Sequence, residues 1–149
     1  MTRDEVTEQV VAARLATGRS WQELADSIGR PVVWTTSALL GQQPIPAAEA
    51  ATLVGLLGLP EECVPILAST PMRGGLSTIV PTDPTVYRFY EAIQVYGPAL
   101  KEVINEQFGD GIMSAINFSV SVERKPHPGG DRVVVTFDGK FLPFDWTSA

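Results

Sequence analysis

The stretch Phe108-Gly-Asp-Gly-Ile-Met-Ser-Ala-Ile-Asn-Phe118 marks the point at which the chain changes from a helical to an extended pattern. The residues before it, from Thr85 onward, predict a long helix that the two glycines close. After it, large apolar residues recur at every second position as far as Val122, and Ser114 lies in phase with them. A period of two predicts a strand with one inward face. A long helix followed by strands predicts an α+β fold for this half of the chain.

The sequence beyond Val122 predicts a small antiparallel sheet. Pro126-His-Pro-Gly-Gly-Asp131 is typical of a turn, and residues 133–137 predict a second strand. Asp138-Gly139 is a signal for a tight hairpin, after which residues 140–144 predict a third strand. Because three strands alone make a poor sheet, we expect helices or a second subunit to cover them.

The long helix has a marked start and an interruption. Asp83 can cap its first turn, and Pro84 suits its first position because proline needs no amide partner there. Gly97-Pro98 lies in the middle, where proline removes an amide and clashes with the preceding turn. We therefore expect a kink or a break at this point.

The segment between the two halves of the chain is rich in residues that break helices and strands. Ser69-Thr-Pro-Met-Arg-Gly-Gly75 predicts a linker. We therefore expect two domains, of residues 1–75 and of residues 76–149.

Residues 1–75 predict a bundle of short helices. Ser20-Trp-Gln-Glu23 has the pattern of a capping box, in which the Ser hydroxyl and the Glu carboxylate satisfy amide groups at a helix start. Gly18 and Gly29 are placed to end helices. Further helix starts are expected at Pro31, Pro46 and Pro60.

Residues 21–40 fit a helix-turn-helix, which has two interpretations: a DNA-binding module, or a compact way to pack helices. The second helix, residues 32–40, carries no Lys, Arg or Asn to offer to base edges and phosphates. Residues 1–75 hold five Arg against eight acidic residues. We therefore expect a structural or assembly role for this domain and no binding of nucleic acid.

Composition bounds the possible functions. The 149 residues carry a net charge of −6, which argues against non-specific binding to nucleic acid. Charged residues make up 19 %, below the ~25 % typical of soluble domains, so we expect part of the surface to be covered by other subunits. No apolar run approaches the ~20 residues of a membrane helix, and no signal peptide is visible. We therefore expect a cytoplasmic protein without membrane contact.

Most catalytic patterns are missing. The single histidine, His127, lies in a Pro/Gly turn, so we interpret it as a solvated loop residue. The single cysteine, Cys63, has no His or second Cys beside it, which leaves a buried or half-buried thiol and no metal motif. No glycine-rich phosphate loop of either standard type occurs.

Two places remain where chemistry is possible. Arg88 and Glu91 lie three apart on the predicted helix, so they share one face, and Tyr87, Phe89 and further aromatic residues surround them. The pair is either a surface ion pair of little energetic value or an anion site built around a planar guanidinium. Ser114 on the inward face of the strand is either a small core residue bonded to a backbone carbonyl or a hydroxyl donor in a small pocket.

The residues around both places resemble the cyanase family. The resemblance is carried by residues 81–91 with 94–97, by residues 108–118, and by Gly139-Lys-Phe-Leu-Pro143, and it extends over roughly residues 20–145. It implies an α+β fold, with an N-terminal helical bundle resembling a repressor-type helix-turn-helix domain that serves assembly. It also implies a C-terminal helix with a small β-sheet for catalysis and dimerisation.

The resemblance also implies the chemistry. Cyanases decompose cyanate with bicarbonate to carbamate, which yields ammonia and carbon dioxide. The family's catalytic residues match Arg88, Glu91 and Ser114 here. The resemblance implies a homodecamer of five dimers with active sites between subunits, and neither a metal nor an organic cofactor, bicarbonate being a co-substrate. Two rival functions remain open: an inactive cyanase-fold assembly protein, and a helix-turn-helix transcriptional regulator.

Overall fold

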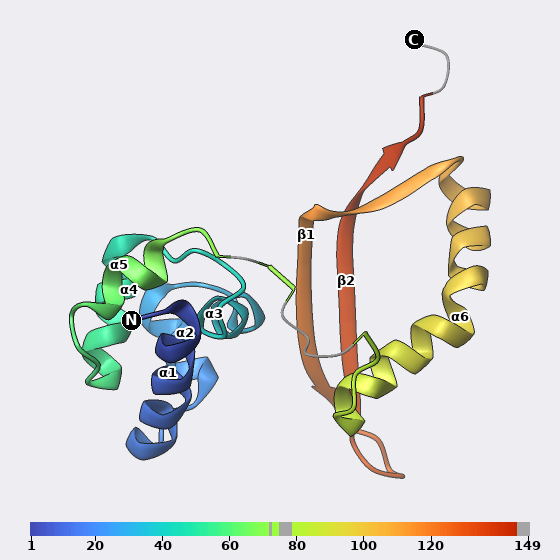
Figure 1. Cartoon of the computed structure of the whole chain (residues 1–149). Helices are drawn as coiled ribbons and strands as arrows, with labels where there is room; N and C mark the ends of the chain where they lie inside the picture. The colour runs from blue at the N-terminus through green and yellow to red at the C-terminus, as the bar shows by residue number, and fades with distance from the viewer. Residues whose placement is uncertain (72, 75–78, 146–149) are drawn as a thin grey trace. The chain divides into compact units, whose positions relative to one another are not determined.

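The computed structural model describes residues 1–71, 73–74 and 79–145 (Figure 1). In this part of the chain helices precede strands, in the order α1 (Arg3–Thr17), α2 (Trp21–Ile28), α3 (Val32–Leu39), α4 (Ala47–Leu57), α5 (Cys63–Ala68), α6 (Pro84–Phe108), β1 (Gly111–Lys125) and β2 (Arg132–Pro143). The two strands pair in one sheet. This arrangement confirms the predicted α+β class.

The chain divides into two compact units. One contains residues 1–75 with 120–135, and the other contains residues 76–119 with 136–149. Helices α1 to α5 belong to the first unit and α6 to the second. The predicted domain limit at residue 75 lies outside the described residues.

Local signals fix the helix ends as the sequence predicts. The Ser20 hydroxyl accepts a hydrogen bond from the Glu23 amide at 3.1 Å, and the Glu23 carboxylate accepts one from the Ser20 amide at 2.7 Å. The bond from the Ser20 amide, with a second bond from the Ser20 hydroxyl to the same carboxylate at 3.0 Å, holds the pKa of Glu23 below its usual value. Gly18 and Gly29 end α1 and α2 with left-handed φ values of 69° and 66°, which glycine adopts without strain.

The helices of the first unit enclose one apolar core. Its fully or almost fully buried members are Val6, Val10, Leu24, Ala38, Leu39, Ile45, Ala50, Leu53, Val54, Leu57, Cys63 and Leu67. Each of the five helices contributes at least one of them. Burial of these side chains is the main source of stability of the bundle.

One partly buried cation connects distant segments of this bundle. The Arg3 guanidinium donates hydrogen bonds to the carbonyl oxygens of Ile66 at 2.5 Å, Ala38 at 3.1 Å and Gln43 at 2.7 Å. Burial lowers the pKa of Arg3 from its ordinary value. Arg3 therefore joins the start of α1 to the ends of α3 and α5, a role that the sequence pattern does not reveal.

The helix-turn-helix region is built from α2 and α3, which pack against each other. The cation next to α3 is already engaged: Arg30 forms an ion pair with Glu49 at 2.8 Å, and its guanidinium lies 4.9 Å from the centre of the Trp34 ring. Glu49 also raises the pKa of Arg30 through this hydrogen bond.

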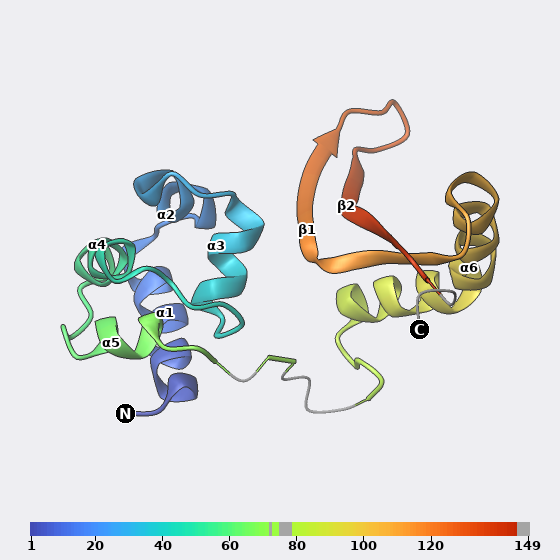
Figure 2. The same ribbon diagram turned by 90° about the horizontal axis from the view of Figure 1, so that it is seen from above.

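Helix α6 begins as predicted and continues through Pro98. The Asp83 carboxylate accepts hydrogen bonds from the amides of Thr85 and Val86, both at 2.9 Å, and Pro84 occupies the first turn. The helix has no break at Pro98, but its axis changes direction part-way along its length, as Figures 1 and 2 show. No residue of α6 is buried within one chain.

The prediction of a third strand is wrong. Asp138-Gly139 lies inside β2 and makes no turn. Gly139 does not adopt the positive φ that a tight hairpin needs. A Cβ at this position would lie 2.5 Å from the Ser114 carbonyl oxygen, so the glycine serves the close approach of two strands.

Within the described residues, no helix combines the length and the apolar character needed to cross a membrane.

Candidate active site

The Arg88–Glu91 pair lies near the start of α6, where the Asp83 cap fixes the helix. The Arg88 Nη1 and Glu91 Oε2 atoms are 2.5 Å apart, across one turn of the helix. Their side chains are 70 % and 45 % exposed within one chain. The pair is therefore formed as predicted, but solvent still reaches it and weakens its charge interaction.

Aromatic side chains border this pair without covering it. The guanidinium carbon of Arg88 lies 5.9 Å from the centre of the Tyr87 ring, and the Tyr87 and Tyr90 rings are 6.2 Å apart. Phe89 and Tyr96 are themselves exposed. The described part of a single chain therefore leaves Arg88 accessible to water.

Ser114 has the opposite environment. It is 4 % exposed and is the only buried polar residue that the described part of α6, β1 and β2 contains. Its hydroxyl oxygen accepts hydrogen bonds from the backbone amides of Ile116 and Asn117, both at 3.0 Å. These bonds run from amides two and three residues ahead and fix the Ser114 side chain against its own strand. Figure 1 shows that β1 bends along its course.

These two amides decide what the Ser114 hydroxyl can still do. A hydroxyl has one proton to donate and two lone pairs to accept with. Both accepting directions are occupied by amides, so the proton is the group left for a further partner. The expected bond to a backbone carbonyl is not found among the described residues, which favours the interpretation of Ser114 as a donor.

Among the described residues of one chain, no hydrogen bond or ion pair joins the two parts of the candidate site. The partners of Arg88 are Glu91 and the Tyr87 ring, whereas those of Ser114 are backbone amides of its own strand. Arg88 and Glu91 come from the first turns of α6, and Ser114 comes from β1.

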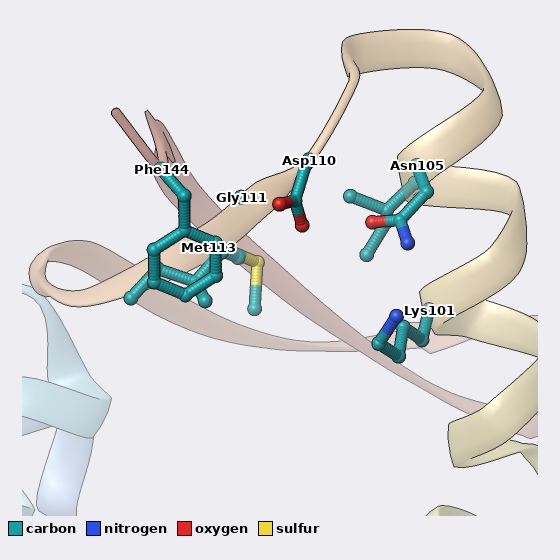
Figure 3. A pocket seen from close by; sticks show the side chains of 8 residues that line it. Lys101, Asn105, Asp110, Gly111, Met113 and Phe144 are labelled. Atoms are coloured by element: carbon teal, nitrogen blue, oxygen red, sulfur yellow. The ribbon is translucent and has the colours of Figure 1, made fainter. Parts of the chain in front are cut away.

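A separate hollow of about 420 Å³ lies between the C-terminal half of α6 and the start of β1. Lys101 and Asn105 face it from α6, with Asp110, Gly111, Met113 and Phe144 on the other side (Figure 3). Sequence reasoning did not find this hollow. The four-residue spacing of Lys101 and Asn105 places them on one helix face, but only the fold brings the Asp110 turn opposite them.

The remaining reactive side chains have structural surroundings. His127 Nδ1 accepts a hydrogen bond from the Gly129 amide at 3.1 Å within the exposed turn. Burial raises the pKa of the Cys63 thiol, which disfavours the reactive thiolate. Within residues 1–71, 73–74 and 79–145, no group of three or more His, Cys, Asp or Glu residues is arranged to hold a metal ion.

Comparison with known proteins decides the family. Residues 3–71 match the model described as cyanate hydratase, N-terminal, and residues 78–146 match the cyanate lyase C-terminal domain. The chain belongs to the cyanate hydratase family. Its membership therefore covers both halves of the sequence, including α6 and β1 with Arg88, Glu91 and Ser114.

Full-length relatives agree with this result. The chain is 73 % identical over 149 residues to the cyanate hydratase of Mycobacterium avium, covering 100 % of this chain and 96 % of the relative. It is 48 % identical over 144 residues to that of Cupriavidus necator, covering 97 % and 98 %. A crystal structure of cyanase from T. urticae matches with a TM-score of 0.83 at 37 % identity, covering 95 % of this chain and 99 % of that one.

Proposed function

We propose that this protein is a cyanate hydratase that decomposes cyanate to ammonia and carbon dioxide, with bicarbonate as the co-substrate and carbamate as the intermediate product. The observation that carries the proposal is the family match over both halves of the chain. The two rival functions, an inactive assembly protein and a transcriptional regulator, are not favoured by it.

The reaction sets a clear physical demand. Two anions must be held together, and the adduct that they form carries two negative charges. Fixed cations and hydrogen-bond donors meet this demand, because they bring the anions together and stabilise the charge without reorganising.

We assign the catalytic roles to Arg88, Glu91 and Ser114. The planar guanidinium of Arg88 binds and neutralises the anionic oxygens. Glu91, 2.5 Å from Arg88, fixes the orientation of that guanidinium and repels wrongly placed anions. The Ser114 hydroxyl, whose lone pairs are occupied by two amides, donates a hydrogen bond to an anionic oxygen.

The surface of α6 supports a homo-oligomer. The apolar residues Val86, Phe89, Ile93, Tyr96, Leu100 and Val103 are all exposed. They are spaced alternately by three and four residues, so they form one stripe along the helix. Full burial of an exposed apolar side chain contributes roughly 1.5–3 kcal/mol, and covering the exposed part of each of these side chains contributes a fraction of that, which together favours a partner subunit.

We propose that this partner is a second copy and that the assembly is a homodecamer of five dimers. Neighbouring copies would then complete the active site by bringing Arg88 of one subunit toward Ser114 of another. Covering the exposed Arg88 would also dry the site and strengthen its attraction for anions.

The N-terminal domain, residues 1–75, is assigned to assembly, and residues 76–149 to catalysis and oligomerisation. We propose no role in nucleic-acid binding, because α3 offers no cationic side chain and Arg30 beside it is paired with Glu49. We also propose a cytoplasmic location and a reaction that uses neither a metal nor an organic cofactor.

Ammonia release from cyanate, measured with and without bicarbonate, tests the function. We expect rapid release that depends on bicarbonate. An assembled protein that releases no ammonia would be an inactive member of the fold. A gel shift at low salt, where even weak phosphate contacts are seen, tests the regulator directly.

A further inference from the structure

Strand β2 passes unusually close to β1 at Gly139. A Cβ at this position would lie 2.5 Å from the Ser114 carbonyl oxygen, 2.5 Å from Met113 Cγ and 3.1 Å from Phe118 Cδ2. Contacts this short to backbone do not occur for real Cβ atoms, so the strand has no room for any side chain here. Gly139 is therefore required by space and not by a positive φ.

The same point of β1 carries the hydrogen bonds of the Ser114 hydroxyl to its own strand. The Ser114 hydroxyl oxygen accepts hydrogen bonds from the amides of Ile116 and Asn117, and the Ser114 carbonyl oxygen is, with Met113 Cγ, the atom nearest to the position that a Gly139 Cβ would take. The hydroxyl and the carbonyl belong to the same residue. A displacement of the carbonyl therefore also displaces the Ser114 Cα, which carries the side chain with the hydroxyl.

We propose that Gly139 is a positioning residue for the reaction, which sets the direction of the Ser114 hydroxyl by letting β2 lie directly against the Ser114 peptide. The inference rests on the proposed function, in which Ser114 contacts the substrate anions. Gly139 has no side chain that could contact them and acts only through Ser114.

The expected effect follows from the geometry. In Gly139→Ala the new methyl group must move from 2.5 Å to an ordinary contact of at least 3.4 Å from the Ser114 carbonyl, a shift of roughly 1 Å. A displacement of ~1 Å at a reacting group costs on the order of a hundredfold in rate. We expect kcat for cyanate to fall ten- to a hundredfold in the assembled enzyme.

Coupling to Ser114 separates positioning from general damage. In a Ser114→Ala background the hydroxyl is already gone, so adding Gly139→Ala should cost little more. Effects of residues that act as one unit are strongly non-additive, whereas independent effects multiply.

Gly111→Ala is the matched control. Its Cβ would meet the Leu142 carbonyl oxygen and the Phe141 ring, so it disturbs the same pair of strands without touching Ser114. Whatever loss it causes should multiply fully with that of Ser114→Ala.

The experiment measures bicarbonate-dependent ammonia release by the single and double variants after their assembly is verified by light scattering. The inference is supported by a large loss in Gly139→Ala that vanishes in the Ser114→Ala background. A parental rate in Gly139→Ala, or a loss that multiplies with that of Ser114→Ala, overturns it and leaves the proposed function intact. A parental rate in Ser114→Ala overturns the site assignment together with the inference.

Where Gly139→Ala does not assemble, the Gly139→Ala/Met113→Ala variant takes its place, with Met113→Ala as its reference. Removing the Met113 side chain relieves one contact and keeps the contact with the Ser114 carbonyl. Failure of this variant to assemble also overturns the inference, because Gly139 would then serve the fold alone.

Discussion

Replacing Ser114 by alanine removes one hydroxyl with two separate duties. That hydroxyl is assigned to donate a hydrogen bond to the anionic substrate, and its oxygen accepts hydrogen bonds from the amides of Ile116 and Asn117. Loss of one donor to a developing anion costs ~3–4 kcal/mol, which is on the order of a hundred- to a thousandfold in rate.

The Ser114→Ala substitution should also lower the free energy of unfolding. Two amides at a site that is 4 % exposed lose their acceptor. A hydrogen bond of this kind contributes about 0.5–1.5 kcal/mol, so we expect a loss of about 1–3 kcal/mol in stability. This loss is large enough to lower the melting temperature by a few degrees and small enough for the protein to fold.

The assay must therefore be made on assembled enzyme. Bicarbonate-dependent ammonia release is measured after light scattering shows the parental size, with Ser119→Ala as the control. Ser119 is exposed on the same strand, so Ser119→Ala shows the effect of replacing a serine of β1 that is not a buried hydrogen-bond donor. An assembled Ser114→Ala enzyme with a near-parental rate would refute the role given to this hydroxyl.

Further variants test the rest of the reasoning. Arg88→Lys should lose most activity while the protein still assembles, because a point charge cannot reproduce a planar fork of donors; rates near the parental value in this assay would contradict the assignment. Glu91→Gln should leave the fold and the assembly intact in light scattering, whereas ammonia release should fall as Arg88 loses its orientation; an unchanged rate would contradict the role given to Glu91. Light scattering should show a large oligomer at micromolar concentration, and a 16.1 kDa species there would contradict the proposed burial of the α6 stripe. Arg3→Ala should lower the free energy of unfolding by about 3 kcal/mol because four carbonyl groups, those of Ile66, Ser69, Ala38 and Gln43, lose a charged donor; an unchanged denaturation midpoint would show that Arg3 does not hold these segments together.

Fold class and helix ends were predictable because they depend on neighbours in the chain. The Ser20–Glu23 capping box and the Asp83 cap consist of hydrogen bonds between residues two or three positions apart. Their residue types at these spacings therefore predict the helix starts. The start of β1 was predictable for a similar reason, since a period of two follows directly from side chains alternating across a strand.

The candidate site was only partly predictable. Spacing alone placed Arg88 and Glu91 on one helix face, and the structure confirms their ion pair. Spacing gave no reason to connect them with Ser114, and that connection came from resemblance to a family. The described part of one chain does not connect them either, because the Arg88 ion pair lies within α6 and the hydrogen bonds of the Ser114 hydroxyl lie within β1.

By itself, then, the sequence determined what short-range hydrogen bonds and periodicity can specify: the helix boundaries, the strand after Gly111, and the family. Tertiary structure decided everything that needs two distant segments to meet. Asp138-Gly139 has the residues of a tight turn, yet the glycine is needed where β2 crosses the Ser114 peptide. Arginine is a residue type usually found at the surface, yet carbonyl groups at the ends of α3 and α5 accept hydrogen bonds from Arg3. In both cases the deciding contact joins residues more than twenty positions apart, and no local pattern encodes such a distance.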